Sequence, residues 1–193
     1  MRTSRSIVAT LAAAAVLAVS VAPAAYAGND VPGPEVAAIR GATAELLFAD
    51  DAELAAAGYA SKLPDGDGVT YCIDAAAGGM GVHYVNGAAL TTPGFDLAKP
   101  EVLVYEPETN GRMHLVAVEF VTFAADVPAG EHPAFVGQDL EYEPGPLVDG
   151  ANRYGLPAFY ALHEWAWKHN PSGMFEDYNP RVQCPGGVSS PIR

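Results

Sequence analysis

The longest β-like run in the chain follows a turn and reads Asn110-Gly111-Arg112-Met113-His114-Leu115-Val116-Ala117-Val118-Glu119-Phe120-Val121-Thr122-Phe123. Asn-Gly is a strong hairpin signal when β-like segments flank it. The upstream segment Glu101–Tyr105 is also rich in valine and leucine. We therefore predict a β-hairpin formed by Glu101–Tyr105 and Arg112–Phe123, with a loop of about five residues between them.

Further strands are predicted on both sides of this hairpin. Short β-like runs cover Val69–Ile73 and Val82–Val85, and the second ends at Asn86-Gly87. In Ala158–Lys168, polar and aromatic residues alternate, which favours a strand over the alternative of a short helix. The segment Val127–Asn152 is rich in proline, glycine and acidic residues and is predicted to be a long surface excursion. Together these runs predict a sheet of about four or five strands.

Helical patterns precede the strands. A first helix is predicted from Pro34 to Phe48, because apolar residues recur there at helical spacing. Asp50 and Glu53 form a capping pair for a second helix over Ala52–Ala57. Helices followed by strands are typical of the α+β class, so we expect N-terminal helices packed on an antiparallel sheet.

The first 27 residues have the pattern of a cleavable signal peptide. Arg2 and Arg5 precede the apolar run Ile7–Val21, and Ala25-Tyr26-Ala27 provides a small-x-small cleavage site. A membrane anchor is the alternative, but a spanning helix needs roughly 20 apolar residues and this run is shorter. We expect cleavage near Ala27 and a single secreted globular domain over residues 28–193, which would not be held by a membrane after cleavage.

The chain is acidic. It has 10 basic and 23 acidic residues, and the predicted export segment contains two arginines and no acids, so the mature charge would be (10 − 2) − 23 = −15. This charge disfavours binding to nucleic acid or anionic lipid. It is compatible with a cationic small molecule, with a metal ion, or with solubility alone. The oligomeric state cannot be deduced from it.

Cys72 and Cys184 are the only cysteines. In an exported protein the natural prediction is one disulfide between them. The alternative is a pair of metal ligands, which the absence of a Cys-x-x-Cys spacing disfavours.

Candidate site residues cluster first in Leu162–Asn170, which contains both tryptophans of the chain. If this segment is a strand, one face carries His163, Trp165, Trp167 and His169. Such a face suits a ligand pocket, and it equally suits a protein core. A zincin motif is absent, because Trp167 stands where its second histidine would be.

Two further candidates lie on other predicted strands. His83, with its neighbour Tyr84, follows glycines that permit close approach of a ligand or another backbone. Glu119 is predicted to share a face with Leu115, Ala117 and Val121, and a carboxylate on an apolar face must be paired, protonated or ligating. An exposed glutamate on an edge strand is the alternative.

If His83, Glu119 and His163 converge, they form a two-histidine, one-carboxylate set suited to a divalent metal ion. The leading hypothesis is a secreted domain that binds a small ligand or a metal ion. One alternative is an extracellular enzyme using the same His/Glu site for metal or acid–base chemistry. The other is a structural or partner-binding exported protein in which these residues belong to the core.

Three segments resemble a family of uncharacterised secreted bacterial proteins. They are Gly79–Asn86, Val102–Pro107 with Asn110–Arg112, and His163–Cys184, which includes Trp-Lys-His-Asn-Pro-Ser-Gly-Met-Phe. The resemblance covers most of the chain after residue 27. It implies one exported domain and no particular activity or ligand.

Overall fold

The computed structural model describes residues 33–63, 72–145 and 154–185. The predicted signal peptide and most of the predicted strand Val69–Ile73 lie outside these ranges.

Helices begin the described chain, as the sequence predicts. Helix α1 (Pro34–Thr43) is followed by a 3-10 turn, η1 (Ala44–Leu46), so the predicted single helix to Phe48 is interrupted after Thr43. Helix α2 (Asp51–Ala56) has the predicted capping box: Asp50 accepts from the backbone N–H of Glu53, and the Glu53 carboxylate accepts from that of Asp50. None of the helices in the described ranges has the combination of length and apolarity that a membrane crossing needs.

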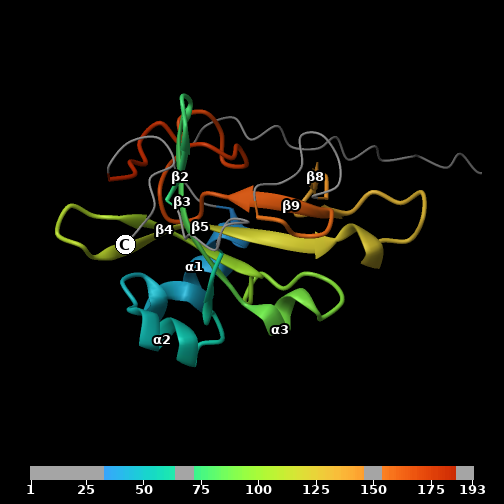
Figure 1. The fold of residues 1–193 in the computed structure, drawn as a ribbon, viewed down its shortest axis with the longest axis horizontal. Helices are drawn as coiled ribbons and strands as arrows, with labels where there is room; N and C mark the ends of the chain where they lie inside the picture. The colour runs from blue at the N-terminus through green and yellow to red at the C-terminus, as the bar shows by residue number, and fades with distance from the viewer. Residues whose placement is uncertain (1–32, 64–71, 146–153, 186–193) are drawn as a thin grey trace, which may run out of the picture. The chain divides into compact units, whose positions relative to one another are not determined.

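The main sheet is antiparallel, and its strands lie in the order β1-β3-β4-β5-β9-β8, with β2 paired to β3 (Figure 1). The predicted hairpin is present as β4 and β5. The sheet has seven strands in the described chain, more than the four or five predicted, because β1, β2 and β8 are too short to show a periodic pattern. The strand bounds are β1 Ser61–Lys62, β2 Ile73–Ala75, β3 Gly78–Val85, β4 Val102–Pro107, β5 Met113–Phe123, β8 Glu141–Glu143 and β9 Phe159–Glu164. The fold is α+β.

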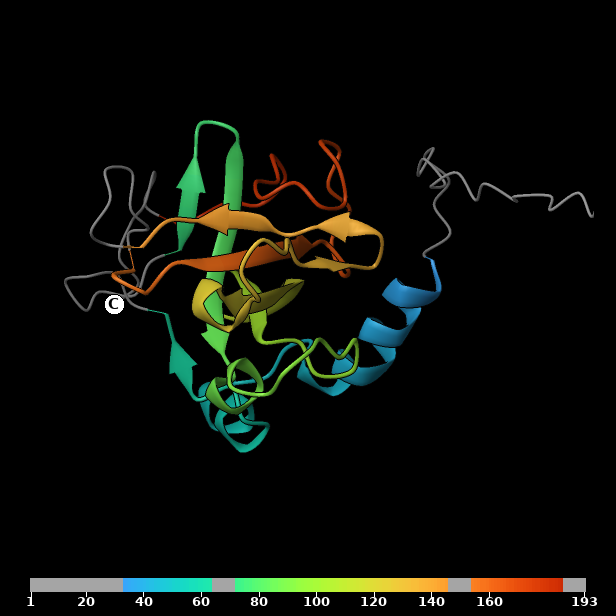
Figure 2. The ribbon, with the colours of Figure 1, turned by 90° about the vertical axis from the view of Figure 1, so that its right-hand side faces the viewer.

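The predicted surface excursion after Val127 is partly wrong. It contains a small two-stranded sheet, β6 (Ala134–Phe135) with β7 (Gln138–Asp139), and then β8, which pairs with β9 in the main sheet. Figure 2 shows this segment running along β9. Two short single-turn elements, α3 (Gly87–Leu90) and η2 (Ala124–Asp126), complete the described helices.

The two faces of the sheet pack against different partners. One face packs on the helices, with Val36 and Ile39 of α1 and Leu54 of α2 in the same core cluster as Leu103 and Phe120. The other face has a smaller apolar cluster of Val102, Val104, Val116, Ala117, Trp165 and Val182. Burying apolar area on both faces is the main contribution of this sheet to stability.

A β-bulge in β5 decides which side chains share a face. Val104 is paired with Ala117 but Tyr105 with Leu115, so Val116 is the extra residue. The alternation of β5 side chains between the two faces of the sheet therefore shifts by one residue at Val116. Leu115 packs on the helix side with Val118, whereas Ala117 lies in the opposite cluster. The prediction that Leu115 shares a face with Glu119 is wrong for this reason.

Strand β9 also ends earlier than predicted. Its last pair with β5 joins Val118 and Glu164, and beyond it the backbone N–H groups of Trp167 and Lys168 both donate to the carbonyl of the bulged Val116. The chain turns there instead of extending to Lys168.

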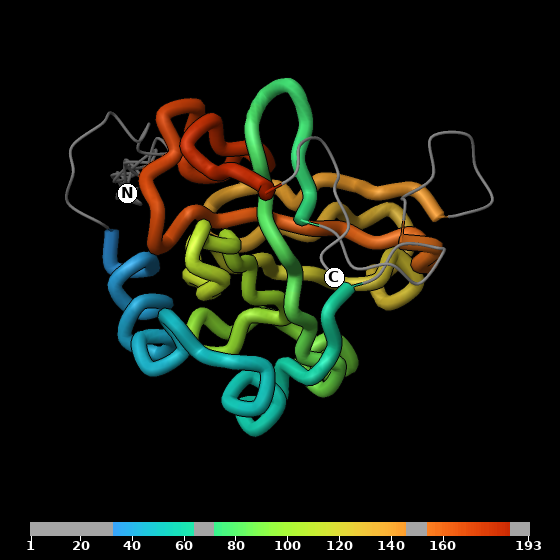
Figure 3. Tube along the Cα trace, turned by 60° about the vertical axis from the view of Figure 1, so that its left-hand side comes forward, coloured from blue at the N-terminus to red at the C-terminus, as the bar shows by residue number. Residues whose placement is uncertain are grey.

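Glycines let the β2–β3 hairpin lie against the C-terminal segment and β4. Gly79 and Asn179 form an isolated bridge, and Figure 3 shows the C-terminal segment in red beside this hairpin in green. Gly81 has φ 122°, and a Cβ there would lie 2.5 Å from the carbonyl oxygen of Tyr105. These glycines allow another backbone segment to approach closely, whereas the sequence left open whether a backbone or a ligand would do so.

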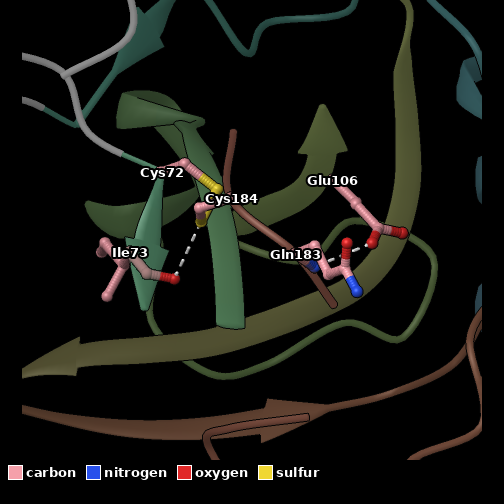
Figure 4. The surroundings of a disulfide bond; sticks show 5 residues. All are labelled: Cys72, Ile73, Glu106, Gln183 and Cys184. Carbon is pink, nitrogen blue, oxygen red and sulfur yellow. Dashed lines mark hydrogen bonds between the residues drawn. A yellow bond between two sulfur atoms is a disulfide. The ribbon is translucent and has the colours of Figure 1, made fainter. Parts of the chain in front are cut away.

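Cys72 and Cys184 form the predicted disulfide, across a sequence separation of 112 residues. It joins the start of the β2–β3 hairpin to the C-terminal segment (Figure 4). Next to it, the backbone N–H of Gln183 donates to the Glu106 carboxylate at 3.0 Å. The C-terminal segment is thus held both covalently and by hydrogen bonding.

Candidate metal centre in a cavity on the sheet

The candidate site lies on the sheet face opposite the helices. Register places its residues there: Glu119 of β5 is opposite His163 of β9 on one side and Val102 of β4 on the other. His83 is on β3, opposite Val104 of β4. Because side chains alternate along strands, these residues project from one face, and the two small valines of β4 separate His83 from Glu119.

The three polar side chains converge. His83 Nε2 lies 3.4 Å from Glu119 Oε1. One ligand atom from each of His83, Glu119 and His163 can be chosen so that all lie within 4.8 Å of one another. Two tetrahedral ligands about 2.1 Å from a zinc ion would be about 3.4 Å apart, so a small inward movement of the third ligand would suffice for coordination.

These side chains are buried and incompletely satisfied. The two histidines are each 2% exposed and Glu119 is 9% exposed. Neither ring nitrogen of His163 has a hydrogen-bond partner among the described residues, and the approach of His83 Nε2 to Glu119 at 3.4 Å is too long and poorly aligned for a full hydrogen bond. Buried polar atoms are nearly always paired, so imidazoles this poorly satisfied around one carboxylate indicate a missing ligand or enclosed water.

Electrostatics favour an ionised glutamate beside neutral imidazole. Burial raises the pKa of the Glu119 carboxyl, but the adjacent His83 imidazole, with a smaller contribution from His163, outweighs burial and leaves the pKa lowered. Burial lowers the pKa of His163 to about 4, against the opposing effect of Glu119. A neutral imidazole and a carboxylate are the protonation states that bind metals.

The three residues His83, Glu119 and His163, here called the trio, line a cavity of about 320 Å³. Its floor is made by apolar side chains of the sheet, including Val85, Val102, Val121 and Phe159. Three more carboxyl groups line it, those of Glu141, Glu143 and Asp177, and no lysine or arginine is among its described lining residues. The cavity is therefore apolar at its floor and acidic around it.

Comparison with family models, with curated proteins and with solved structures found no match to this chain. The chemistry of the site is therefore argued from its own geometry.

The other residues predicted to bind ligand do not line the cavity. Strand β9 ends at Glu164, so the predicted alternation does not continue beyond it. Trp165 still packs on the same side of the sheet as His163, whereas Trp167 packs on the helix side, so the predicted alignment of all four side chains on one face is wrong. Trp165 is buried, with its ring centroid 4.5 Å from that of His163 and its indole N–H donating to the Glu176 carbonyl. Trp165 therefore packs against the His163 ring.

Trp167, His169 and Tyr84 lie elsewhere. The Trp167 indole N–H donates to Thr43 Oγ1 of α1 at 2.9 Å. His169 is exposed, and its Nδ1 lies 3.2 Å from an Arg181 nitrogen. Tyr84 alternates with His83 and packs on the helix side, where its hydroxyl donates to Asp51 at 2.8 Å. None of the three is a lining residue of the cavity.

Sequence reasoning did not identify the acidic part of the cavity. Glu141 and Glu143 lie on β8, which has only three residues and sits in an acid-rich segment. Asp177 lies in the irregular C-terminal segment that the disulfide holds in place. The i, i+2 spacing of the two glutamates was the one available signal, and it is informative only once β8 is known to be a strand.

Proposed function

We propose that this protein binds a divalent transition-metal ion through His83, Glu119 and His163. The observation that carries the proposal is the convergence of three ligand atoms within 4.8 Å in a buried cavity. The unpaired ring nitrogens support it, because an ion would satisfy atoms that the described residues leave without partners.

The donor set indicates which ions to test. Two imidazoles and one carboxylate suit zinc, iron, manganese or copper rather than calcium or magnesium, which prefer oxygen ligands. The Irving–Williams order predicts tighter binding of zinc than of manganese at such a site.

Metal analysis of natively purified protein tests the proposal, followed by calorimetric titration of the metal-free protein with zinc. We expect one ion per chain and loss of high-affinity binding in His163→Ala. His114→Gln is the matched control, because His114 lies on the same strand as Glu119 but outside the cavity. Equal zinc affinity in wild type and His163→Ala would contradict the proposal and leave the trio as a buried polar cluster of the core.

A second candidate function is metal-dependent catalysis outside the cell. The observation that favours it is the cavity itself, because three protein ligands leave coordination positions open and a substrate could approach the ion from this space. A broad screen of hydrolytic and oxidative substrates tests it. Turnover should require the added metal and disappear in His163→Ala; a metal-bound protein without turnover would favour simple binding.

The proposal includes export from the cytosol and membership of a family of secreted bacterial proteins. The disulfide supports an oxidising compartment, and the predicted signal peptide supports secretion. Mass spectrometry of the exported protein should place its N-terminus near Gly28. An N-terminus at Met1 would contradict cleavage. The acidity of the chain supports a small cation, and not nucleic acid, as its partner.

A further inference from the structure

The acidic side chains of the cavity are placed by the sheet register. On β8, Glu141 is opposite Ala161 and Glu143 is opposite Phe159, and both of these β9 residues line the cavity. The two glutamates therefore project over the same face as His163. Asp177 reaches the cavity from the C-terminal segment.

No lysine or arginine is present among the described lining residues to balance the charge of these carboxylates. Burial, followed by repulsion from Glu141, Glu119 and other acids, raises the pKa of Asp177 to about 7. Burial and the same two glutamates raise the pKa of Glu143 as well. With all four lining carboxyl groups ionised, a divalent ion at the trio would leave 4 − 2 = 2 negative charges in the cavity.

Most of the remaining lining residues of the cavity are apolar. Val121 and Phe123 of β5 and Phe159 of β9 form a continuous hydrophobic floor, in which Phe159 lies beside Glu143 of β8. A volume of about 320 Å³ is at the lower end of the range for sites that hold small organic molecules.

The unpaired His163 imidazole indicates independently that this space holds a ligand. Both nitrogens of His163 are without partners, the side chain is 2% exposed, and it lines the same cavity as the carboxylates. In the acidic cluster Glu141 is exposed and Glu143 and Asp177 are half-buried, so the cluster forms the rim of a cavity that also contains this unsatisfied buried side chain.

We propose that the cavity binds a small organic cation, a primary amine with a short apolar body, whose ammonium group lies among Glu141, Glu143 and Asp177. The apolar body lies on the floor formed by Phe159 and Phe123, which the register places next to Glu143. The inference rests on the proposed function, since it assigns the class of ligand that shares the cavity with the metal ion.

Calorimetric titration with three probes of one carbon skeleton tests the charge requirement. Hexylamine, 1-hexanol and hexanoate are titrated into zinc-loaded protein at neutral pH. We expect hexylamine to bind at least about tenfold more tightly than 1-hexanol, and hexanoate to bind most weakly, because charge-assisted hydrogen bonds are the stronger ones. Equal affinity of the amine and the alcohol would overturn the inference.

Two variants test the location of the ammonium group. Glu143→Gln and Asp177→Asn should each lower hexylamine affinity by about tenfold and change zinc affinity by less than about twofold. Glu131→Gln is the matched control, because Glu131 is exposed and does not line the cavity. Unchanged hexylamine affinity in both variants would overturn the inference.

Repeating the hexylamine titration on metal-free protein separates the two proposals. Retained amine selectivity without any zinc binding would refute the metal site and leave the amine site standing. Zinc binding without amine selectivity would refute the amine site and leave the metal site standing. Amine binding that disappears with the metal and ignores the carboxylate variants would show direct coordination to zinc and overturn the placement among the carboxylates.

Discussion

Glu119 Oε1 lies 3.4 Å from His83 Nε2, although strand β4 separates the two residues in the sheet. The contact is possible because the β4 side chains between them are Val102 and Val104, which are too short to fill the space above the strand. A larger residue at either position would separate the two ligands. The site thus depends on small residues of the central strand as much as on its polar ones.

Zinc should raise the thermal stability of the protein through Glu119. A ligand that binds only the native state at a hundredfold excess over its Kd contributes about 2.7 kcal/mol, which raises Tm by about 5–10 °C in a chain of this size. Differential scanning calorimetry with and without zinc measures the shift. In Glu119→Gln the shift should nearly vanish, whereas His132→Gln, an exposed histidine outside the cavity, should keep it. A full shift in Glu119→Gln would place the zinc elsewhere.

Loss of the disulfide should be strongly destabilising. Cys72 and Cys184 close a loop with a sequence separation of 112 residues, for which the chain-entropy model gives about 4–5 kcal/mol. We expect the double variant Cys72→Ser/Cys184→Ser to lose a free energy of unfolding of this order in urea titrations. Adding reductant to the wild type should produce a similar loss and leave the double variant unchanged. A loss below about 1 kcal/mol would mean that the remaining contacts hold the C-terminal segment without the bond.

The predictable parts of the fold were those with a long or specific local pattern. The β4–β5 hairpin has an Asn-Gly turn and a long apolar run, and α2 has its Asp50/Glu53 cap. Strands of two or three residues, such as β1 and β8, have no period to detect. They form because a neighbouring strand offers free backbone groups, which is a tertiary effect.

The site was predictable in its residue types and not in its geometry. His83, Glu119 and His163 stood out as polar side chains on apolar strands, but their convergence depends on the register of four strands. One extra residue, Val116, changes the alternation of β5 and ends β9 before Trp165. A bulge leaves no reliable trace in hydrophobic periodicity. The sequence alone therefore could not show that His163 and Trp167 lie on different sides of the sheet.

Glu101 should make stability fall as pH rises above about 4.5. Burial raises the pKa of its carboxyl from 4.5 to about 7, against the hydrogen bond from the Val121 backbone N–H. Below pH 4.5 the carboxyl is protonated in both states; between 4.5 and 7 only the unfolded state loses its proton, so unfolding is favoured. The fall is at most about 3 kcal/mol.

Urea unfolding of wild type and Glu101→Gln across this pH range measures the effect. The variant should show a smaller fall, because a neutral amide can still accept the hydrogen bond from Val121. Glu131→Gln, on the exposed surface, should follow the wild type. Parallel curves for wild type and Glu101→Gln would assign the pH dependence to other groups.

Replacing Glu164 should stabilise the protein. Its side chain is fully buried, and neither carboxylate oxygen has a hydrogen-bond partner among the described residues. Burial, and then the charge of Glu35 on α1, raise its pKa to about 7. Removing an unpaired buried carboxyl in favour of an apolar side chain of similar volume should gain about 1–3 kcal/mol, so Glu164→Met should unfold at higher urea concentration.

Glu164→Gln is the informative companion of this variant. It keeps the polar atoms and removes only the ionisable proton, so its gain should be smaller than that of Glu164→Met. Zinc affinity should be nearly unchanged in both variants, because alternation along β9 directs Glu164 to the face opposite His163. A loss of stability in Glu164→Met would mean that enclosed water satisfies the carboxyl, and that the group stabilises the packing of α1 on the sheet.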